Sequence, residues 1–340
     1  MRFVLPAGPP LAAPSCAVGH GSATLIDSSR DDRVLGLDCW YPAYGVDSPM
    51  PTVYELLPGI GVTAAAGEGD GAISGAHPLL VWSHGRTGTR TAYVMLCEGL
   101  AARGYVVVAP DHPGDTLADW MTGTAVDDAT NERQRVADVR FVLDVLLGGG
   151  AWLDAPPALD AARVTVAGHS YGAYTALALA GSAQPEPRIR AVAGLQSLTR
   201  TLSAAELGRI TVPTLLVVGT ADDVTPPTTD ADAAFRALGA ADGRRVDIER
   251  AGHQACSDVG LYLELISQVE GIPDLVRDFV LGMATQVTGT AGDPWRLTVG
   301  LHLRVLAAWL DDVNDRDREH AEHELEAIRA SPGLTMRGAR

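Results

Sequence analysis

A serine stands between two glycines where an expected strand meets an expected helix. The stretch "RVTVAGHSYGAYTALALA", residues 163–180, contains the pattern G-H-S-Y-G around Ser170. A β-branched strand leads in and an alanine-rich helix leads out, which is the setting of a nucleophile elbow. The two glycines remove side chains where strand and helix crowd a tight turn. The pattern predicts that Ser170 is an acyl-transfer nucleophile; the alternative is a serine that only caps a helix.

A serine hydroxyl needs a neighbouring base, and the base needs a carboxylate that orients it. The segment "VPTLLVVGTADDVTPP" ends an apolar run with two aspartates, and "AGHQACSD" places a histidine on a glycine turn after a later strand. The spacing from Gly219 and Pro226 favours Asp222 as the orienting acid, with Asp223 as a turn residue or second acceptor. His253 is the expected base.

Three other histidines fit the role of the base less well. His84 and His112 precede the serine in the chain and follow two earlier strands. His169 lies inside the expected elbow, where its side chain should point away from the hydroxyl of Ser170.

Acyl transfer also needs donors that stabilise the oxyanion of the tetrahedral intermediate. One expected donor is the backbone N–H of Tyr171, directly after the serine. The other is the backbone N–H of Arg86, in the loop "SHGRTGTR" that follows the strand expected at 79–83. Losing one such donor costs about 3 kcal/mol of transition-state stabilisation.

A backbone donor leaves the Arg86 side chain available for another role. One hypothesis is that it lines the pocket mouth with Arg90 and pairs with a carboxylate or phosphate of the substrate. The alternative is that it bridges to the acidic loop "DHPGD" at residues 111–115.

The composition excludes several classes of function. The 340-residue chain has a formal net charge of −16 and a pI near 4.9, so nucleic acid and anionic membranes are not expected partners. All 26 basic residues are arginine, which excludes Schiff-base lysines, lysine general bases and P-loop lysines. The four cysteines show no CxxC or Cys/His ligand spacing, so no metal, disulfide framework or cofactor is expected.

No run of about 18 apolar residues is present, so no membrane span is expected. Prolines interrupt the first twenty residues, where a signal peptide needs a continuous apolar stretch. We therefore expect a cytoplasmic protein with an extended N-terminal arm at residues 1–20.

Alternating strands and helices must position these groups. After a hairpin at residues 21–41 and a surface segment at 58–77, the strands are short, β-branched and continuously apolar, as in a parallel sheet buried on both faces. They are expected at 79–83, 105–109, 163–167, 189–194, 213–218 and 244–249, with helices at 91–103, 129–147, 171–181 and 228–238. The predicted fold class is α/β: a mostly parallel, doubly wound sheet with flanking helices.

One domain is expected over residues 1–312. A helical insertion or cap should lie within 257–296, near the C-terminus, and an amphipathic helix at 297–310 should close the domain. The segment 313–340 is strongly charged and is expected to be a solvated helical tail.

The sequence resembles the platelet-activating-factor acetylhydrolase and dienelactone-hydrolase-like branch of the α/β-hydrolase superfamily, and is also similar to actinobacterial cutinase-type polyester hydrolases. The resemblance covers about residues 17–310. It implies Ser170, Asp222 and His253 as the triad, and the amides of Arg86 and Tyr171 as oxyanion donors. It rests on the segments "LDCWYPA", "LLVWSHG", "GYVVVAPDHPGDT", "ADVRFVLDVLL", "VAGHSYGAYTA", "GTADDVTPP" and "AGHQACSD".

The favoured function is a serine hydrolase that cleaves a small-molecule carboxylic ester, thioester or activated acyl substrate, anionic if Arg86 contacts it. The same acyl-enzyme in an acyltransferase or cyclase is the first alternative, and a non-catalytic binding module is the second. The sequence does not indicate an oligomeric state. Trp120, Met121 and Trp152 are candidate pocket walls, although such residues are more often core or capping contacts.

Overall fold

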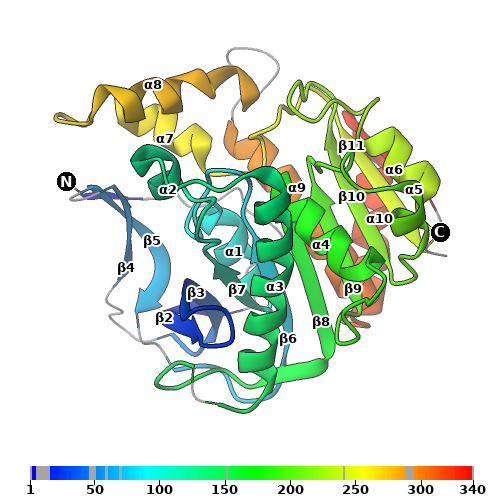
Figure 1. Ribbon diagram of the computed structural model, residues 1–340. Coiled ribbons are helices and arrows are strands. Elements are labelled where there is room, and N and C mark those ends of the chain that lie inside the picture. Colours follow the sequence, from blue (N-terminus) through cyan, green and yellow to red (C-terminus); the bar gives the residue numbers. More distant parts are fainter. Residues whose placement is uncertain are drawn as a thin grey trace.

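One sheet organises the chain (Figure 1). The computed structural model describes residues 2–4, 16–45, 51–57, 60–68, 71–150, 152–239, 242–287 and 295–338. In these residues twelve strands form the sheet, in the order β1-β5-β2-β3-β7-β6-β8-β9-β10-β11-β12, with β4 paired to β5. The strands are β1 (Arg2–Val4), β2 (Ala17–Asp27), β3 (Arg33–Ala43), β4 (Pro51–Leu57), β5 (Ile60–Glu68), β6 (His77–Ser83), β7 (Val106–Pro110), β8 (Leu159–His169), β9 (Ala191–Leu195), β10 (Thr214–Gly219), β11 (Gly243–Ile248) and β12 (Leu334–Gly338).

The centre of the sheet is parallel. Strands β7, β6, β8, β9, β10 and β11 pair side by side in the same direction. The expected hairpin is present as the antiparallel pair β2–β3, and β3 joins the parallel strands through an antiparallel pairing with β7. The mostly parallel α/β sheet predicted from the sequence is therefore confirmed.

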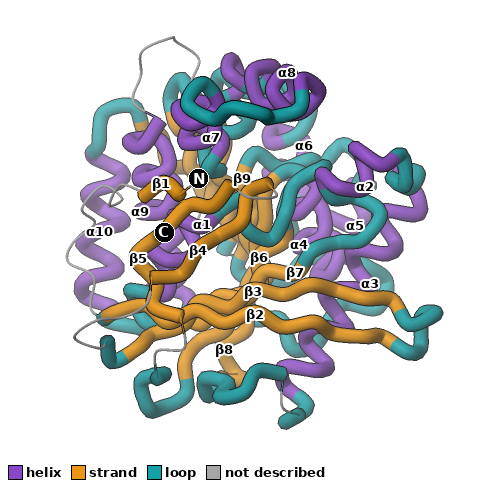
Figure 2. The backbone as a smooth tube through the Cα atoms, turned by 90° about the vertical axis from the view of Figure 1, so that its left-hand side faces the viewer, coloured by secondary structure: helices purple, strands orange, loops and turns teal. Residues whose placement is uncertain are grey.

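Helices cover both faces of the sheet. Figure 2 shows α9 (Trp295–Val313) and α10 (Arg318–Ala330) on one side of the strands, together with α1 (Val94–Ala101). On the other side lie α3 (Asp128–Leu147), α4 (Tyr171–Gly181), α5 (Ala204–Gly208) and α6 (Ala231–Ala237). Along β6, Leu80 and Trp82 pack into the first layer and Leu79 and Val81 into the second. This alternation explains why the strand is continuously apolar.

The N-terminal part differs from expectation. Residues 60–68, expected to lie on the surface, form β5, which pairs with β1, β2 and β4. Residues 17–20 of the expected arm belong to β2, and residues 2–4 form β1. The rest of the arm, residues 5–15, lies outside the described residues. A Gly- and Ala-rich strand lacks the β-branched signal that identifies strands in sequence, which explains the error for β5.

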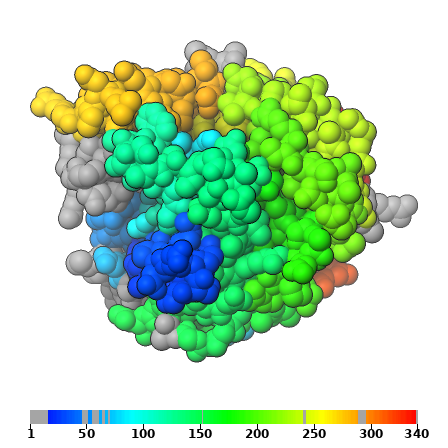
Figure 3. Space-filling view, in the orientation of Figure 1, coloured from blue at the N-terminus to red at the C-terminus, as the bar shows by residue number. Residues whose placement is uncertain are grey.

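Two short helices lie within residues 257–296, where a helical insertion or cap was expected, and we call them the cap. They are α7 (Val259–Ile266) and α8 (Asp274–Gly282), and the 3₁₀ turn Ala284–Gln286 follows. Residues 288–294 lie outside the described part of the chain. Figure 3 shows the cap, in yellow to orange, along one edge of the molecule next to α2 (Leu117–Thr122). Trp120 of α2 contacts Phe279 of α8, with ring centroids 5.0 Å apart, and so acts as a capping contact.

The segment after residue 313 is not the solvated tail that its charge suggested. Helix α10 packs against α9 and buries Ala321 and Ile328, and β12 pairs antiparallel with β11 at the edge of the sheet. Ala321, Leu325 and Ile328 share one face of α10 at helical spacing, but charged residues surround them, which is why the segment was expected to be solvated. Among the described helices, none combines the length and the apolar character needed to cross a bilayer.

Replacing Ile328 tests whether α10 is part of the core. Ile328 is fully buried, so we expect Ile328→Ala to lower the free energy of unfolding by about 2–5 kcal/mol. Urea denaturation measures this change. Glu326→Ala, at an exposed position of the same helix, is the matched control and should change stability little. Equal, small effects of both substitutions would mean that α10 does not stabilise the fold.

Candidate active site

The elbow after β8 requires both of its glycines. A Cβ atom on Gly172 would lie 1.8 Å from the carbonyl oxygen of Ser83, and one on Gly168 would lie 2.5 Å from the same atom. Only glycine allows the end of β6 and the start of α4 to approach this closely. The glycines thus place the turn that carries Ser170 directly against the loop that follows β6.

Ser170 adopts a strained backbone conformation, with φ of 55° and ψ of −114°. Such a conformation persists only where neighbouring contacts hold it. Here Ser170 N donates to the Leu195 carbonyl at 3.0 Å, and the N–H groups of Tyr174 and Leu198 donate to the Ser170 carbonyl at 3.1 and 3.2 Å. The hydroxyl makes no capping hydrogen bond to α4, so the alternative of a helix-capping serine is not what the structure shows.

His253 lies in the loop after β11 and is oriented by Asp222. Its Nδ1 donates to Asp222 Oδ2 at 2.9 Å, and both residues are buried. Because a carboxylate only accepts, Nδ1 carries the proton and Nε2 is the basic nitrogen. His253 and Ser170 line the same cavity, which brings together the base and the nucleophile predicted from the sequence.

The loop after β10 stabilises the charge of Asp222. Backbone N–H groups of Val224 and Thr225 donate to its Oδ1 at 2.9 and 2.8 Å, and Thr225 Oγ1 lies 2.7 Å from Oδ2. Burial works to raise the pKa of Asp222, but the hydrogen bonds from His253 and Thr225 outweigh it and lower the pKa below its usual value. Asp223 is exposed beside it. The geometry therefore favours Asp222 over Asp223.

His169 and Tyr93 connect the loop of Arg86 to the loop of His253. His169 Nε2 lies 2.7 Å from the His253 carbonyl, so it must donate, and its Nδ1 therefore accepts from the Tyr93 hydroxyl at 2.7 Å. The Tyr93 oxygen in turn accepts from Gly85 N at 3.2 Å. Burial, together with the nearby His253, holds the pKa of His169 well below its usual value, so the ring stays neutral. Its nitrogens are committed to these bonds, as expected for a histidine directed away from the reacting hydroxyl.

The Gly85 carbonyl fixes the orientation of the next amide. His84 Nδ1 donates to it at 2.7 Å, and Arg135 Nη2 and Gly88 N each donate at 3.1 Å. In a planar trans peptide, the N–H of Arg86 points opposite to that carbonyl. The fully buried Arg135, which holds this carbonyl, therefore fixes the orientation of the Arg86 amide, and Arg86 lines the cavity.

The second expected donor is at the start of α4. Tyr171 is the first residue of this helix, so its N–H has no partner within the helix. Arg86 and Tyr171 both line the cavity beside Ser170. The positions of the two amides thus suit the stabilisation of an oxyanion formed at that serine.

A second Ser–His–Asp row exists in the core. Ser83 Oγ lies 2.8 Å from His112 Nε2, and His112 Nδ1 lies 3.0 Å from Asp138 Oδ2. All three residues are fully buried and none lines the cavity. Burial and the charge of Arg135 lower the pKa of His112 to about 4. Because a substrate cannot reach Ser83, these hydrogen bonds are structural. Ser170 and His253, in contrast, line the cavity.

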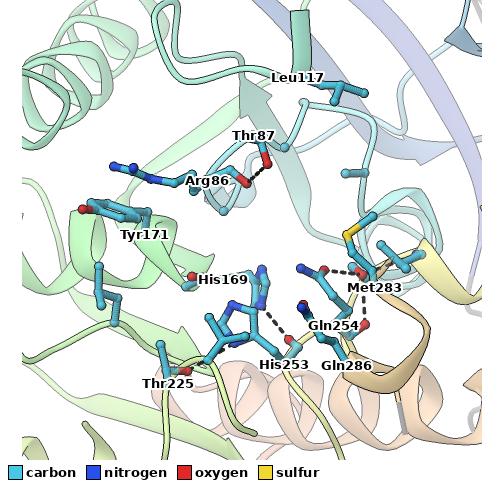
Figure 4. Close-up of a pocket in the computed structure, with 18 of the residues that line it drawn as sticks. Arg86, Thr87, Leu117, His169, Tyr171, Thr225, His253, Gln254, Met283 and Gln286 are labelled. Atoms are coloured by element: carbon cyan, nitrogen blue, oxygen red, sulfur yellow. Dashed lines mark hydrogen bonds between the residues drawn. The ribbon is translucent and has the colours of Figure 1, made fainter. Parts of the chain in front are cut away.

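The side chains of Arg86 and Arg90 are paired with carboxylates of the protein. Figure 4 shows the Arg86 side chain beside the Tyr171 ring, and its guanidinium lies 4.5 Å from the ring centroid. This guanidinium also donates to Asp128. Its Nε also lies 3.9 Å from an oxygen of Asp115, in the loop "DHPGD". This favours the acidic-loop alternative for Arg86.

Arg90 does not line the pocket mouth with Arg86. It donates to Asp38 and Asp111, and it is not among the residues that line the cavity. The expectation for Arg90 is therefore corrected: Asp38 in the middle of β3 and Asp111 after β7 hold its guanidinium.

The cavity above Ser170 has a volume of about 550 Å³. The strand-end loops supply its floor, and the cap supplies Tyr262, Phe279, Val280 and Met283 as one wall. Segment 257–287 is thus part of the cavity, which the sequence could not establish. Trp152 packs in the core under α3 instead, so it is not a pocket wall.

Comparisons with known proteins agree with this geometry. Residues 71–141 match the family of platelet-activating factor acetylhydrolase, isoform II. A ferulic acid esterase from Streptomyces cinnamoneus superposes with a TM-score of 0.72 at 24% sequence identity, over 96% of this chain and 98% of that chain. This chain has the α/β-hydrolase fold. The family match bears out the resemblance to the acetylhydrolase-like branch, and the structural match shows the fold.

The family match has a defined extent within this α/β-hydrolase. It includes β6, the loop of Arg86, β7 and the first part of α3 with Arg135, and it ends before Ser170. The roles of Ser170, Asp222 and His253 therefore rest on the geometry and not on the family match.

Sequence reasoning missed Tyr93, Thr225 and Arg135. Arg135 did leave a signal, because it lies four residues before Val139 on the apolar face of α3, where an arginine is expected only if it is paired. Tyr93 left none, since its partners Gly85 and His169 come from other loops. Thr225 contacts Asp222 within the same loop, and that contact matters only through the pairing of Asp222 with His253.

Substitution of Arg135 tests whether the Gly85 carbonyl must be held. Lysine keeps the charge but cannot hold two carbonyls with one planar group. We expect Arg135→Lys to lower kcat for ester hydrolysis by about 10²–10³, the cost of one oxyanion donor, with a smaller change in KM. Arg133→Lys, at an exposed position of the same helix, is the control. An unchanged kcat per folded molecule would contradict the positioning role.

Proposed function

We propose that this protein is a serine hydrolase that cleaves a carboxylic ester through an acyl-enzyme. The observation that carries the proposal is the geometry of one cavity. It is lined by a serine on a strained elbow and by a histidine whose Nδ1 is bonded to a buried aspartate. The ester-hydrolysing relatives support the reaction class.

The proposed reaction has two halves. His253 Nε2 takes the proton of Ser170 as Oγ attacks the carbonyl carbon, and the amides of Arg86 and Tyr171 stabilise the oxyanion. Asp222 keeps the imidazole in the required tautomer and stabilises the imidazolium. His253 then protonates the leaving alcohol. A water molecule, deprotonated by His253, attacks the acyl-enzyme, and collapse of the second intermediate releases the acid and restores Ser170.

The charges around the cavity favour an uncharged ester. Arg86 is paired with Asp128 and lies near Asp115, so a substrate carboxylate would have to displace an existing partner. Arg200, also at the cavity, lies 3.6 Å from an oxygen of Asp230. We therefore propose a neutral small-molecule ester rather than an anionic one.

Acyl transfer to an alcohol or amine uses the same acyl-enzyme. The observation that favours it is the cap, because a wall above Ser170 restricts water around the intermediate. Product analysis with an added alcohol separates the two reactions. Hydrolysis is the proposal, and a product that is mainly the transferred ester would replace it with the acyltransferase.

A fluorophosphonate probe and short p-nitrophenyl esters test the nucleophile. We expect the probe to modify Ser170, identified by peptide mass spectrometry, and Ser170→Ala to abolish both labelling and the burst of nitrophenol. Ser83 is an internal control, because its hydroxyl is fully buried and should stay unmodified. Hydrolysis that survives in Ser170→Ala would sink the assignment, and absence of labelling would favour a non-catalytic binding module.

The neighbouring aspartates provide a matched pair for the orienting acid. Asp222→Asn removes the carboxylate that fixes the His253 tautomer, so we expect kcat to fall by about 10³–10⁴. Asp223→Asn changes an exposed side chain and should leave kcat within about twofold. Steady-state kinetics on the same ester compares the two. The reverse order of effects would transfer the role to Asp223.

A further inference from the structure

A second, smaller cavity lies beneath the cap. Its volume is about 80 Å³. Most of its wall comes from α7, α8 and the turn between them, and these side chains are aliphatic. They are Leu265, Ile266, Val269, Ile272, Val276 and Val280. No ionisable side chain other than the phenol of Tyr262 lines it, so its interior suits an apolar group.

This cavity adjoins the one above Ser170. Thr89, Leu117, Tyr262 and Val280 line both of them. A substrate held at Ser170 can therefore extend an apolar group between these side chains and into the smaller cavity. The hydroxyls of Thr89 and Thr91 lie 3.2 Å apart and can satisfy each other, so an apolar group there leaves neither hydroxyl unpaired.

The volume of the smaller cavity limits which apolar group it can hold. An apolar cavity of about 150 Å³ accommodates benzene, so about 80 Å³ is too small for an aromatic ring. The smaller cavity therefore suits a short length of a narrow, saturated chain.

Resting on the proposed function, we propose that the smaller cavity is an acyl pocket that binds the end of a straight aliphatic acyl chain. The leaving oxygen of the ester must face His253, which protonates it. The wall next to His253 carries the polar residues Gln254 and Gln286. The acyl pocket opens instead between Thr89 and Leu117, beside the loop of Arg86. The acyl side of the ester thus faces the pocket, and the alcohol side faces the polar wall.

The pocket predicts a chain-length profile with a limited window. For p-nitrophenyl esters of increasing acyl length, kcat/KM should rise about fourfold for each methylene that enters the pocket. The rise should extend over the first few carbons of the chain and then stop. Acetate esters of alcohols of increasing length should show no such window. A rise with alcohol length instead, or preference for an aromatic acid, would overturn the assignment of the pocket to the acyl chain.

Substitutions of Val276 should shift the preferred acyl-chain length to shorter or to longer chains. Val276 is nearly fully buried on α8, and Val276→Phe should fill the pocket and shift the optimum to shorter chains. Val276→Ala should enlarge it and shift the optimum to longer chains. The measured quantity is the ratio of kcat/KM for the longest and shortest chains, which is independent of the folded fraction. Leu275→Phe adds the same ring at an exposed neighbouring position and should leave the ratio unchanged.

A binding measurement separates failure of the pocket from failure of the proposed reaction. Straight-chain alkanols, measured by calorimetry with the Ser170→Ala protein, should bind with an affinity that rises with length over the same window. Ester hydrolysis without a window would overturn the acyl pocket and leave the hydrolase intact. Absence of hydrolysis in the wild type would overturn the hydrolase, and alkanol binding that is insensitive to Val276→Phe would overturn the pocket.

Discussion

The close contact between the end of β6 and the turn after β8 determines where every proposed catalytic group lies. Gly168 and Gly172 allow the Ser83 carbonyl to approach within a distance that no Cβ would permit. The loop of Arg86 therefore starts directly beside Ser170, and Arg86 and Tyr171, which carry the two proposed oxyanion amides, line one cavity. A side chain at either glycine would separate the strand ends and with them the two proposed oxyanion donors.

Buried charge maintains this contact on the side away from the cavity. Arg135, with no exposed surface, donates to the His84 and Gly85 carbonyls and to Asp115. A buried arginine is costly to desolvate, and its pairing seldom gives a net gain in stability. In the proposed mechanism, Arg135 instead fixes the orientation of the Arg86 amide. A donor that is fixed before the reaction needs no reorganisation when the oxyanion forms. The buried hydrogen bonds from Ser83 through His112 to Asp138 belong to the same network.

The candidate site residues that the sequence predicted are those whose proposed role follows from local patterns. Ser170 lies in a strand–turn–helix pattern, and Asp222 and His253 follow strands whose carboxyl ends meet at one edge of the sheet. Tyr93 precedes α1 and could not be found, because its partners Gly85 and His169 come from other loops. The contact of Thr225 with Asp222 is local, but it has a meaning only once Asp222 is paired with His253. The same limit applies to the fold: β5 is Gly- and Ala-rich, and β12 is recognisable only by its pairing with β11.

The cap separates substrate selection from the proposed chemistry. Its apolar side chains form a cluster of their own around Val276, and only a few of them reach the cavity that contains Ser170. Substitutions in that cluster can therefore change the volume next to the cavity without moving the strand ends. The groups proposed to react are held instead by the sheet, by close glycine contacts and by buried hydrogen bonds. Residues of the cap, rather than those of the elbow, should therefore determine which ester is cleaved. A substitution that changes specificity can leave the hydrogen-bond network around Arg135 intact.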